Sequence, residues 1–215
     1  MKKQNKRALS LISGGIDSPV ASYRMVSEGW DLDFVFFFTK PFVRDEEKEL
    51  VFSCIKQLKQ TTGKKEFKLF IVPSSESHIA LITKCPPAFR HIVLRRLMFR
   101  IAAALAKKNK CSALVTGENL GQVSSQTLQN LVAISEASDV PILRPLLGFD
   151  KMETARIAEQ IGTFVHSKCH KDCGLGAVSN PVTAVKLDDL KKIEKKLPIA
   201  KLVQQAAKRV ETVLL

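Results

Sequence analysis

The sequence predicts an α/β fold in which a doubly wound parallel sheet of five strands is covered by helices on both faces. Short apolar or β-branched runs alternate with amphipathic segments along the 215 residues, which is typical of parallel strands joined by helical crossovers. The first apolar run ends in a glycine turn that leads into a helical pattern. The composition, 45% hydrophobic and 26% charged, is that of a globular chain able to bury a core.

In the first half of the chain, glycine and proline set the expected boundaries of the elements. The apolar run 8–12 is a buried strand that stops at the glycine turn, and the helix after it closes at Gly29. An aromatic strand ends before Pro41, and a third strand ends before Pro73. The expected strands are 8–12, 32–38 and 67–72, and the expected helices are 20–28, 46–61 and 89–108.

The second half continues the alternation and ends in basic helices. Strands are expected at 113–116, ended by Gly117, and at 141–143, and helices at 124–136, 151–161, 187–196 and 198–213. The stretch from His166 to Pro181 has no periodicity and is expected to be a loop. We expect residues 1–180 to form one domain and residues 181–215 a basic helical appendage packed on it.

Charge and cysteine content exclude some classes of protein. The 34 Lys and Arg residues against 21 Asp and Glu give a net charge of +13, which favours a polyanionic partner. No stretch approaches the roughly 20 apolar residues of a membrane helix, so no membrane association is expected. Five scattered cysteines, an odd number, argue against a disulfide framework and favour a reducing, cytoplasmic location.

The glycine turn is the first candidate site. It comprises Ser13, Gly14, Gly15, Ile16, Asp17 and Ser18. Backbone N–H groups, serine hydroxyls and a helix N-terminus can together hold a phosphate, although the turn is not a Walker A motif. Asp17 would then bind Mg²⁺ or fix the loop. The alternative is a structural helix entry, with Asp17 or Ser18 as the N-cap and Pro19 in the first turn.

A second motif narrows the interpretation. The turn is similar to the SGGxDS loop of the PP-loop ATP pyrophosphatases, and residues 114–131 (LVTGENLGQVSSQTLQNL) resemble the TGExLGQxxSQTxxNL signature of ThiI-type tRNA 4-thiouridine synthetases. Residues 89–98, 143–151 and 172–173 support the same resemblance, which covers almost the whole chain from Ala8 to about Lys196. It implies a Rossmann-like fold of the adenine nucleotide alpha hydrolase type.

The resemblance also implies an activity and a set of site residues. Enzymes of this family split ATP into AMP and pyrophosphate to adenylate a uridine of tRNA, and sulfur then replaces AMP to give 4-thiouridine at position 8. Residues 37–42 fall where the family holds adenine. The implied ATP-binding residues are the turn Ser13–Ser18 with Phe38, Thr39, Arg96, Gly117, Gln122 and Gln126, and Mg²⁺ is the expected cofactor.

Cys173 matches the family cysteine that attacks or delivers sulfur to the adenylated uridine. The neighbouring Lys168, His170 and Lys171 would favour its thiolate. Relatives with a rhodanese domain carry the persulfide there, and the given sequence ends before such a domain. A cysteine desulfurase or sulfide is therefore an expected sulfur donor, and Cys169 is a candidate resolving partner.

Metal binding is the alternative for these thiols. Cys85, Cys169 and Cys173 could hold an iron–sulfur cluster or zinc, and His166 and His170 could complete a structural zinc site. Cys54 and Cys111 are expected to be buried, inert thiols.

The expected macromolecular partner is tRNA. Between Lys84 and Lys110 there are eight basic residues and no acidic one, and both chain ends add further positive charge that can contact phosphates. Because the glycine turn begins at Ser13, no THUMP domain is expected before it, and we expect either that this chain acts alone or that a separate THUMP protein binds the tRNA. A homodimer is a further expectation.

The rival functions are another PP-loop tRNA enzyme, of the 2-thiolation or lysidine type, and a non-catalytic protein that binds nucleotide or tRNA.

Overall fold

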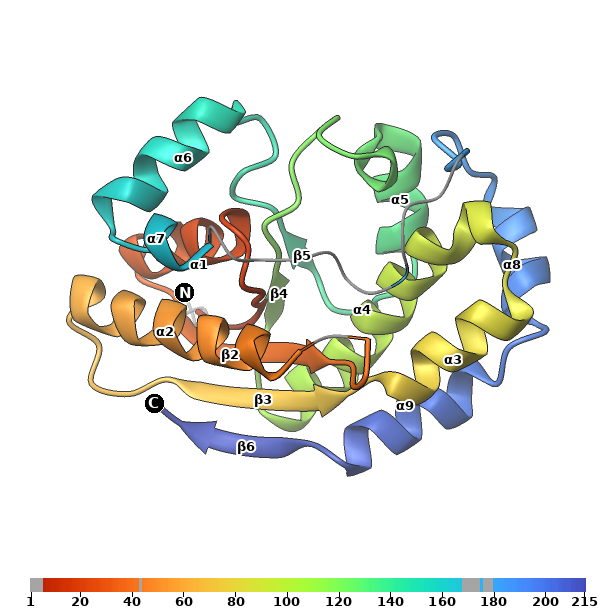
Figure 1. The fold of residues 1–215 in the computed structure, drawn as a ribbon, viewed down its shortest axis with the longest axis horizontal. Coiled ribbons are helices and arrows are strands. Elements are labelled where there is room, and N and C mark those ends of the chain that lie inside the picture. The colour runs from red at the N-terminus through yellow and green to blue at the C-terminus, as the bar shows by residue number, and fades with distance from the viewer. Residues whose placement is uncertain (1–5, 43, 168–174, 176–179) are drawn as a thin grey trace, which may run out of the picture.

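The computed structural model describes residues 6–42, 44–167, 175 and 180–215, and its centre is a mostly parallel sheet (Figure 1). The strand order is β5-β4-β1-β2-β3-β6, and all neighbours are parallel except β6, which runs antiparallel to β3. The strands are β1 (Arg7–Leu11), β2 (Asp31–Phe38), β3 (Lys68–Pro73), β4 (Ala113–Val115), β5 (Ile142–Leu143) and β6 (Glu211–Leu214). The predicted doubly wound α/β fold is confirmed.

Helices cover both faces of the sheet (Figure 1). One face carries α1 (Asp17–Ser27), α2 (Asp45–Thr62), α6 (Lys151–Gln160) and the short α7 (Phe164–Ser167), which contact one another. The other carries α3 (Ser75–Lys84), α4 (Arg90–Lys108), α5 (Leu128–Ser135), α8 (Leu187–Glu194) and α9 (Ile199–Lys208). Single 3₁₀ turns, η1 (Pro87–Phe89) and η2 (Ser124–Gln126), precede α4 and α5. None of the described helices is long and apolar enough to cross a membrane.

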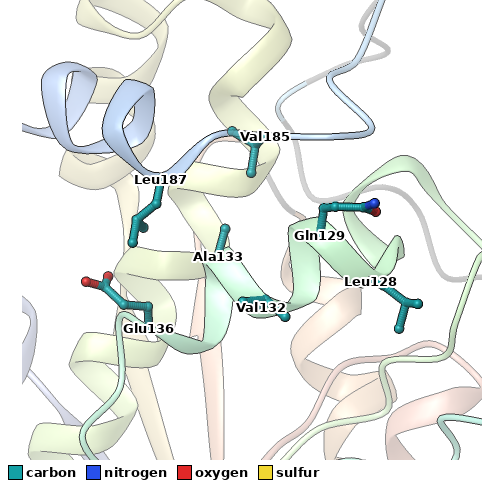
Figure 2. A pocket seen from close by; sticks show the side chains of 7 residues that line it. All are labelled: Leu128, Gln129, Val132, Ala133, Glu136, Val185 and Leu187. Carbon is teal, nitrogen blue, oxygen red and sulfur yellow. The ribbon is translucent and has the colours of Figure 1, made fainter.

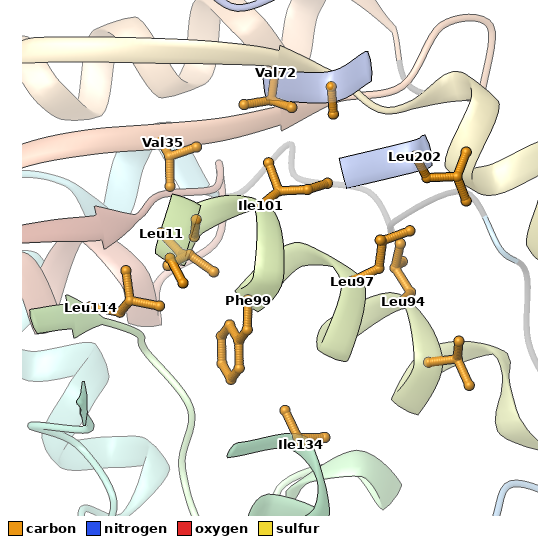
Figure 3. Packing of buried hydrophobic residues seen from close by; sticks show 14 of the residues in the cluster. Leu11, Val35, Val72, Leu94, Leu97, Phe99, Ile101, Leu114, Ile134 and Leu202 are labelled. Atoms are coloured by element: carbon orange, nitrogen blue, oxygen red, sulfur yellow. The ribbon is translucent and has the colours of Figure 1, made fainter. Parts of the chain in front are cut away.

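Alternate strand residues feed two separate cores, as the period of two of a β-strand requires. Leu9, Leu11 and Val35 face α4, whereas Ala8 and Phe34 belong to the cluster under α1 and α2. Figure 3 shows the first of these cores, in which strand side chains meet residues of α4, α5 and α9. The residues it labels are Leu11, Val35, Val72, Leu94, Leu97, Phe99, Ile101, Leu114, Ile134 and Leu202.

The strand order reverses between β1 and β4. The chain moves from β1 through β2 to β3 in one direction, and β4 then pairs with the other side of β1. The chain that leaves β1 enters α1 on one face, and the chain that leaves β4 leads to α5 on the other. In doubly wound sheets the ligand crevice lies at such a reversal, at the carboxyl edge of the sheet. The glycine turn and Gly117 both lie at this edge.

Three elements, β6, α3 and the short α7, were not predicted from the sequence. The strand β6 covers β3, so that the sheet has six strands instead of five, and the predicted helix 198–213 ends at Lys208. Helix α3 also escaped prediction because its apolar pattern is inverted: Ile79 and Ile82 are exposed, while Ser77 is buried. Residues 181–215 thus contain a strand of the central sheet, and the domain division at residue 180 stays a prediction.

Two further predicted elements differ in the structure. The helix expected over 124–136 is divided at Thr127, which takes an extended backbone conformation and caps α5 by accepting a hydrogen bond from the N–H of Asn130 (3.3 Å). His166 lies in α7 and not in the loop predicted from His166 to Pro181. Most of that loop lies outside the described residues.

A buried ion cluster joins the C-terminal region to the rest of the fold. Glu194 on α8 accepts two hydrogen bonds from Arg96 (2.8 and 3.0 Å) and two from Arg100 (2.7 and 2.8 Å). Arg96 is 1% exposed and donates further to Glu136 and to the carbonyl of Ala133 on α5. One guanidinium thus holds α4, α5 and α8 together, in the bidentate geometry that arginine favours.

Removal of Glu194 should destabilise the fold strongly. Glu194→Ala leaves the buried Arg96 without its main counter-ion, and we expect a loss of about 3–5 kcal/mol in the free energy of unfolding, measured in urea. The control is Glu76→Ala, which removes the exposed partner of Arg209 and should cost less than about 1 kcal/mol. Equal losses in the two variants would contradict a structural role for the cluster.

The same carboxylate predicts acid sensitivity. Burial alone would raise the pKa of Glu194, but hydrogen bonds from Arg100 and Arg96 outweigh it, and the pKa is lowered. A lowered folded-state pKa stabilises the protein above the unfolded-state pKa, and this contribution disappears as the pH falls through the folded-state pKa. Urea titrations across this acid range should show a smaller pH dependence for Glu194→Gln than for the wild type.

Candidate functional site

The glycine turn forms a compact loop tied to the start of α1. The backbone N–H of Ser13 donates to Ser18 Oγ (2.8 Å), and the two serine hydroxyls lie 3.2 Å apart. The N–H of Gly15 donates to Ser13 Oγ (3.3 Å). The serines of the motif therefore shape the loop from within.

The first turn of α1 presents backbone donors to this loop. Its N-cap residue, Ile16, makes no side-chain capping hydrogen bond, so no side chain occupies the positive end of the helix there. Asp17 and Ser18 lie inside the helix, which begins three residues earlier than predicted, and neither is the N-cap. Below the loop, buried Ser22 bonds Ser10 Oγ (2.8 Å) and the carbonyl of Ser18 (2.8 Å), which fixes α1 on β1. The result is a rigid helix entry with an uncapped N-terminus.

Gly117, after β4, packs directly on this helix entry. A Cβ atom built on Gly117 would lie 2.7 Å from the backbone C of Asp17 and 2.7 Å from the backbone N of Ser18. Real Cβ atoms do not approach backbone so closely, so only glycine fits here without displacement of one of the two loops. The predicted site residues Gly117 and Asp17–Ser18 are therefore brought together across the crevice.

A buried carboxylate holds the loop after β4 in place, and sequence reasoning gave it no role. Glu118 is 2% exposed and accepts a hydrogen bond from Arg144 Nε (2.9 Å), which follows β5. Arg144 also donates to Ser135 Oγ (2.9 Å) on α5. Arg95 Nη1 lies 3.9 Å from Glu118 Oε1 and is one-third exposed. The available sequence signal was an acidic residue, Glu118, after β4 and a basic residue, Arg144, after the neighbouring strand β5.

Asp17 lies half-buried at the mouth of the loop. Burial raises the pKa of its carboxyl group, and the positive charge of Lys151 at the start of α6 offsets part of this. Burial destabilises the ionised form of a carboxylate, and a nearby cation stabilises that form. One carboxylate beside a phosphate-binding turn is also a donor set that Mg²⁺ uses together with phosphate oxygens. The described residues contain no group of three or more His, Cys, Asp or Glu side chains that could hold a metal by themselves.

Phe38 and Thr39 lie at the carboxyl end of β2, on the same edge of the sheet. Phe38 is half-buried, and its carbonyl accepts a hydrogen bond from the N–H of Ser74 (2.9 Å) after β3. Thr39 is buried, with its hydroxyl 2.6 Å from Ser74 Oγ. Thr39 therefore has a structural partner, while Phe38 offers a partly exposed ring beside the crevice.

The two glutamines of the second motif differ in environment. Gln122 is exposed, whereas Gln126, in η2, is 6% exposed. Within the part of the chain that the structure describes, Gln126 Oε1 is buried without a hydrogen-bond partner. An unpaired buried amide oxygen is costly, and a donor from a ligand would remove the penalty. Gln126 is thus the better-supported of the two as a ligand contact.

Arg96 is not directed to the crevice. Its guanidinium is occupied by Glu194, Glu136 and a backbone carbonyl, as described above, and these contacts replace the expected role in ATP binding. Arg95, its neighbour on α4, is the arginine that reaches the loop after β4. Other cations of the run 84–110 are also engaged: Arg90 bonds the carbonyls of Cys85 and Ile82, and Lys107 pairs with Asp139. The run therefore offers less open positive surface than its formal charge suggests.

Of the five cysteines, Cys169 and Cys173 lie outside the described residues. The other three are buried and free of disulfides. Burial raises the pKa of Cys54 to about 12 and is the main cause that raises the pKa of Cys85 and Cys111 to about 11. Cys54 and Cys111 match the expected inert thiols, and Cys85 shares their character, because its thiol lies in the core and contacts the carbonyl of Pro86 (3.6 Å).

Comparison with known proteins identifies the family. A family model described as thiamine biosynthesis protein (ThiI) matches residues 3–199. The chain belongs to the ThiI family. Probable tRNA sulfurtransferases from Coxiella burnetii and Thermus thermophilus are 40% and 38% identical to this ThiI-family chain over 209 and 207 residues. These matches cover 96% and 95% of the chain but 53% and 50% of the relatives, so the chain spans about half their length.

Solved structures support the same placement. A 4-thiouridine synthetase, in a crystal structure of its RNA complex with bound ATP, matches 97% of this ThiI-family chain and 55% of its own chain, with a TM-score of 0.90 and 34% identity. The NMN synthetase of Francisella tularensis matches with a TM-score of 0.59 at 12% identity, which shows the shared fold alone.

The contact at Gly117 gives a direct test of the site's geometry. Gly117→Ala should force the two loops apart and cost about 1–3 kcal/mol in the free energy of unfolding. Gly148→Ala is the matched control, because a Cβ there meets no atom within 4 Å, and it should change stability by less than about 0.5 kcal/mol. Equal stability of the two variants in urea titrations would contradict the close packing.

Proposed function

We propose that this ThiI-family chain carries the ATP-dependent adenylation and sulfur-transfer activity that makes 4-thiouridine at position 8 of tRNA. The observation that supports this best is the glycine turn packed against Gly117 at the point where the strand order reverses. Ligands of doubly wound sheets bind in this crevice. The names of the relatives, tRNA sulfurtransferase and 4-thiouridine synthetase, supply the chemistry.

ATP fits the crevice with its phosphates on the glycine turn. The N–H groups of Gly14 and Ile16 and the uncapped end of α1 would receive the phosphates, and Arg95 and Lys151 add positive charge nearby. Asp17 would hold Mg²⁺, which neutralises phosphate charge when bound. Adenine would lie against the Phe38 and Thr39 end of β2. Gln122 and Gln126 would bond ribose, phosphate or base, and Arg96 is left out of the proposed site.

The reaction proceeds in two displacements. The uridine O4 attacks the α-phosphorus of ATP, and the bond to the β-phosphate breaks, so that pyrophosphate leaves with its electron pair. The O4-adenylated ring is then attacked at C4 by a sulfur nucleophile, and AMP leaves with the O4 oxygen. The chain's task is to hold the two substrates in line and to stabilise the charge on the departing phosphates.

Cys173 is the proposed sulfur-bearing residue. A donor of the persulfide class, such as a cysteine desulfurase, would transfer its terminal sulfur to the Cys173 thiolate. The donor's own thiolate leaves, and the terminal sulfur of the resulting Cys173 persulfide attacks C4. A second thiolate, for which Cys169 is the candidate, then attacks Cys173 Sγ, releases 4-thiouridine and leaves a disulfide that an external thiol reduces. An iron–sulfur or zinc site at Cys85, Cys169 and Cys173 is not part of this proposal, because two of its three thiols lie outside the described residues.

The tRNA partner would be held by phosphate contacts. Exposed cations that remain on α4 and near it, such as Lys84 and Lys108, suit sequence-independent contacts of this kind. The proposal also includes a homodimer and a THUMP domain, which lies on a separate protein or elsewhere in a longer chain. Adding a separate THUMP protein to the activity assay tests the contribution of that domain.

Asp17 gives the first functional test. Asp17→Asn should reduce the rate of tRNA-dependent pyrophosphate release by at least about 100-fold, because one charged group at the phosphates is lost. Asp45→Asn, which removes an exposed carboxylate paired with Lys40, should retain full activity. Full activity of Asp17→Asn would contradict the assignment of the loop.

Cys173 gives the second test. Cys173→Ala should lower the rate of 4-thiouridine formation by at least about 10³-fold while pyrophosphate is still released, because the adenylation step does not use the thiol. Nucleoside mass spectrometry and pyrophosphate release measure the two steps separately. Normal thiolation by the variant would remove Cys173 from the mechanism, and ATP binding without pyrophosphate release in the wild type would favour a non-catalytic protein.

A further inference from the structure

We propose that Thr127 and Asn130, at the start of α5, are positioning residues for sulfur transfer. They fix residues 182–185, the chain that returns from the stretch containing Cys173, against the element that carries Gln126. This inference rests on the proposed function, because it takes Cys173 as the sulfur-bearing residue.

Asn130 uses its whole side chain for this contact. It is fully buried, and its Nδ2 donates to the carbonyls of Val182 (2.8 Å) and Ser124 (2.6 Å). Its Oδ1 accepts a hydrogen bond from the N–H of Val185 (3.0 Å). A side chain that offers two donors and an acceptor in one plane bridges the two backbone segments, and no apolar residue of similar size can replace it.

Thr127 makes a second, parallel contact. Its hydroxyl donates to the carbonyl of Thr183 and accepts the hydrogen bond from the N–H of Asn130 that caps α5. The same atom thus joins the helix start to the returning chain. Val182 is also held by its N–H, which donates to the carbonyl of Ala88 (3.3 Å) next to α4.

Apolar contacts anchor the same region from below. Figure 2 shows Val185 and Leu187 facing α5 across an apolar pocket of about 450 Å³. Val185 and Leu175 both belong to the core cluster that contains Ala133 and Ile134 of α5. Leu175 follows Cys173 by two positions in the sequence, and Cys173 itself lies outside the described residues.

This arrangement joins the two halves of the proposed reaction. Gln126, with its unpaired buried amide oxygen, directly precedes Thr127, and the carbonyl of Gln126 accepts a hydrogen bond from the N–H of Gly121 in the loop after β4. The stretch 121–130 therefore joins the loop after β4 to residues 182–185. A shift of α5 would therefore move the loop after β4 relative to residues 182–185.

Three substitutions at Thr127 separate positioning from simple helix capping. Thr127→Ser keeps both the cap and the donor to Thr183. Thr127→Asp keeps a strong capping acceptor but cannot donate, and its charge repels the carbonyl. Thr127→Val loses both. Gln129→Ala, on the exposed side of α5, is the control.

The readout is the ratio of 4-thiouridine formed to pyrophosphate released in single turnovers with ATP, tRNA and a persulfide donor. We expect Thr127→Asp and Thr127→Val to lower this ratio at least about tenfold, because small misplacements of reacting groups are costly, with Thr127→Ser and Gln129→Ala within about twofold of the wild type. A wild-type ratio in Thr127→Asp would show that the hydroxyl only caps the helix and would overturn the inference. If Thr127→Val does not fold, the Ser and Asp pair decides.

The same experiment separates the inference from the proposed function. A wild-type protein that releases pyrophosphate but forms no 4-thiouridine would contradict the proposed function, and the inference would fall with it. Wild-type thiolation with equal ratios in all variants would leave the proposed function standing and overturn the positioning role alone.

Discussion

The backbone contact between Gly117 and the start of α1 is the constraint on which the architecture of the site depends. It joins the loops that leave β1 and β4, which pair with each other at the reversal of strand order. The crevice between these loops is fixed by glycine on one side and by a serine-braced turn on the other. The buried pair of Glu118 and Arg144 then holds the loop after β4 to the end of β5. The geometry of the proposed phosphate site therefore depends on three neighbouring strands and not on the glycine motif alone.

Polar side chains with buried positions extend this framework away from the crevice. Arg96 and Glu194 fix α4, α5 and α8, and Asn130 fixes α5 to residues 182–185. Each of these side chains satisfies its hydrogen-bonding groups with partners distant in sequence, which makes the relative positions of the helices specific. A catalytic cycle that uses a nucleotide in one place and a thiol from another segment requires such fixed relations between elements.

The sequence was sufficient for the five parallel strands, because each is a short apolar run bounded by glycine or proline. It was also sufficient for the glycine turn, whose residues are contiguous. It failed for α3, where Ile79 and Ile82 face outward. It also failed for β6, a short exposed strand that forms because the edge of β3 is open for pairing. It also failed to separate Arg95 from Arg96. Consecutive residues point about 100° apart on a helix, and only the fold shows that Glu194, 98 residues later, takes Arg96.

The central claim is that this ThiI-family chain supports ATP-dependent thiolation of tRNA. The most direct measurement is mass spectrometry of the tRNA nucleosides from cells that lack the protein, compared with cells that express the wild type from a plasmid. We expect 4-thiouridine to be absent from the cells that lack the protein and to return in the cells that express the wild type, while other thiolated nucleosides are unchanged. Unchanged 4-thiouridine in the deleted strain, or the selective loss of a different thiolated nucleoside, would contradict it.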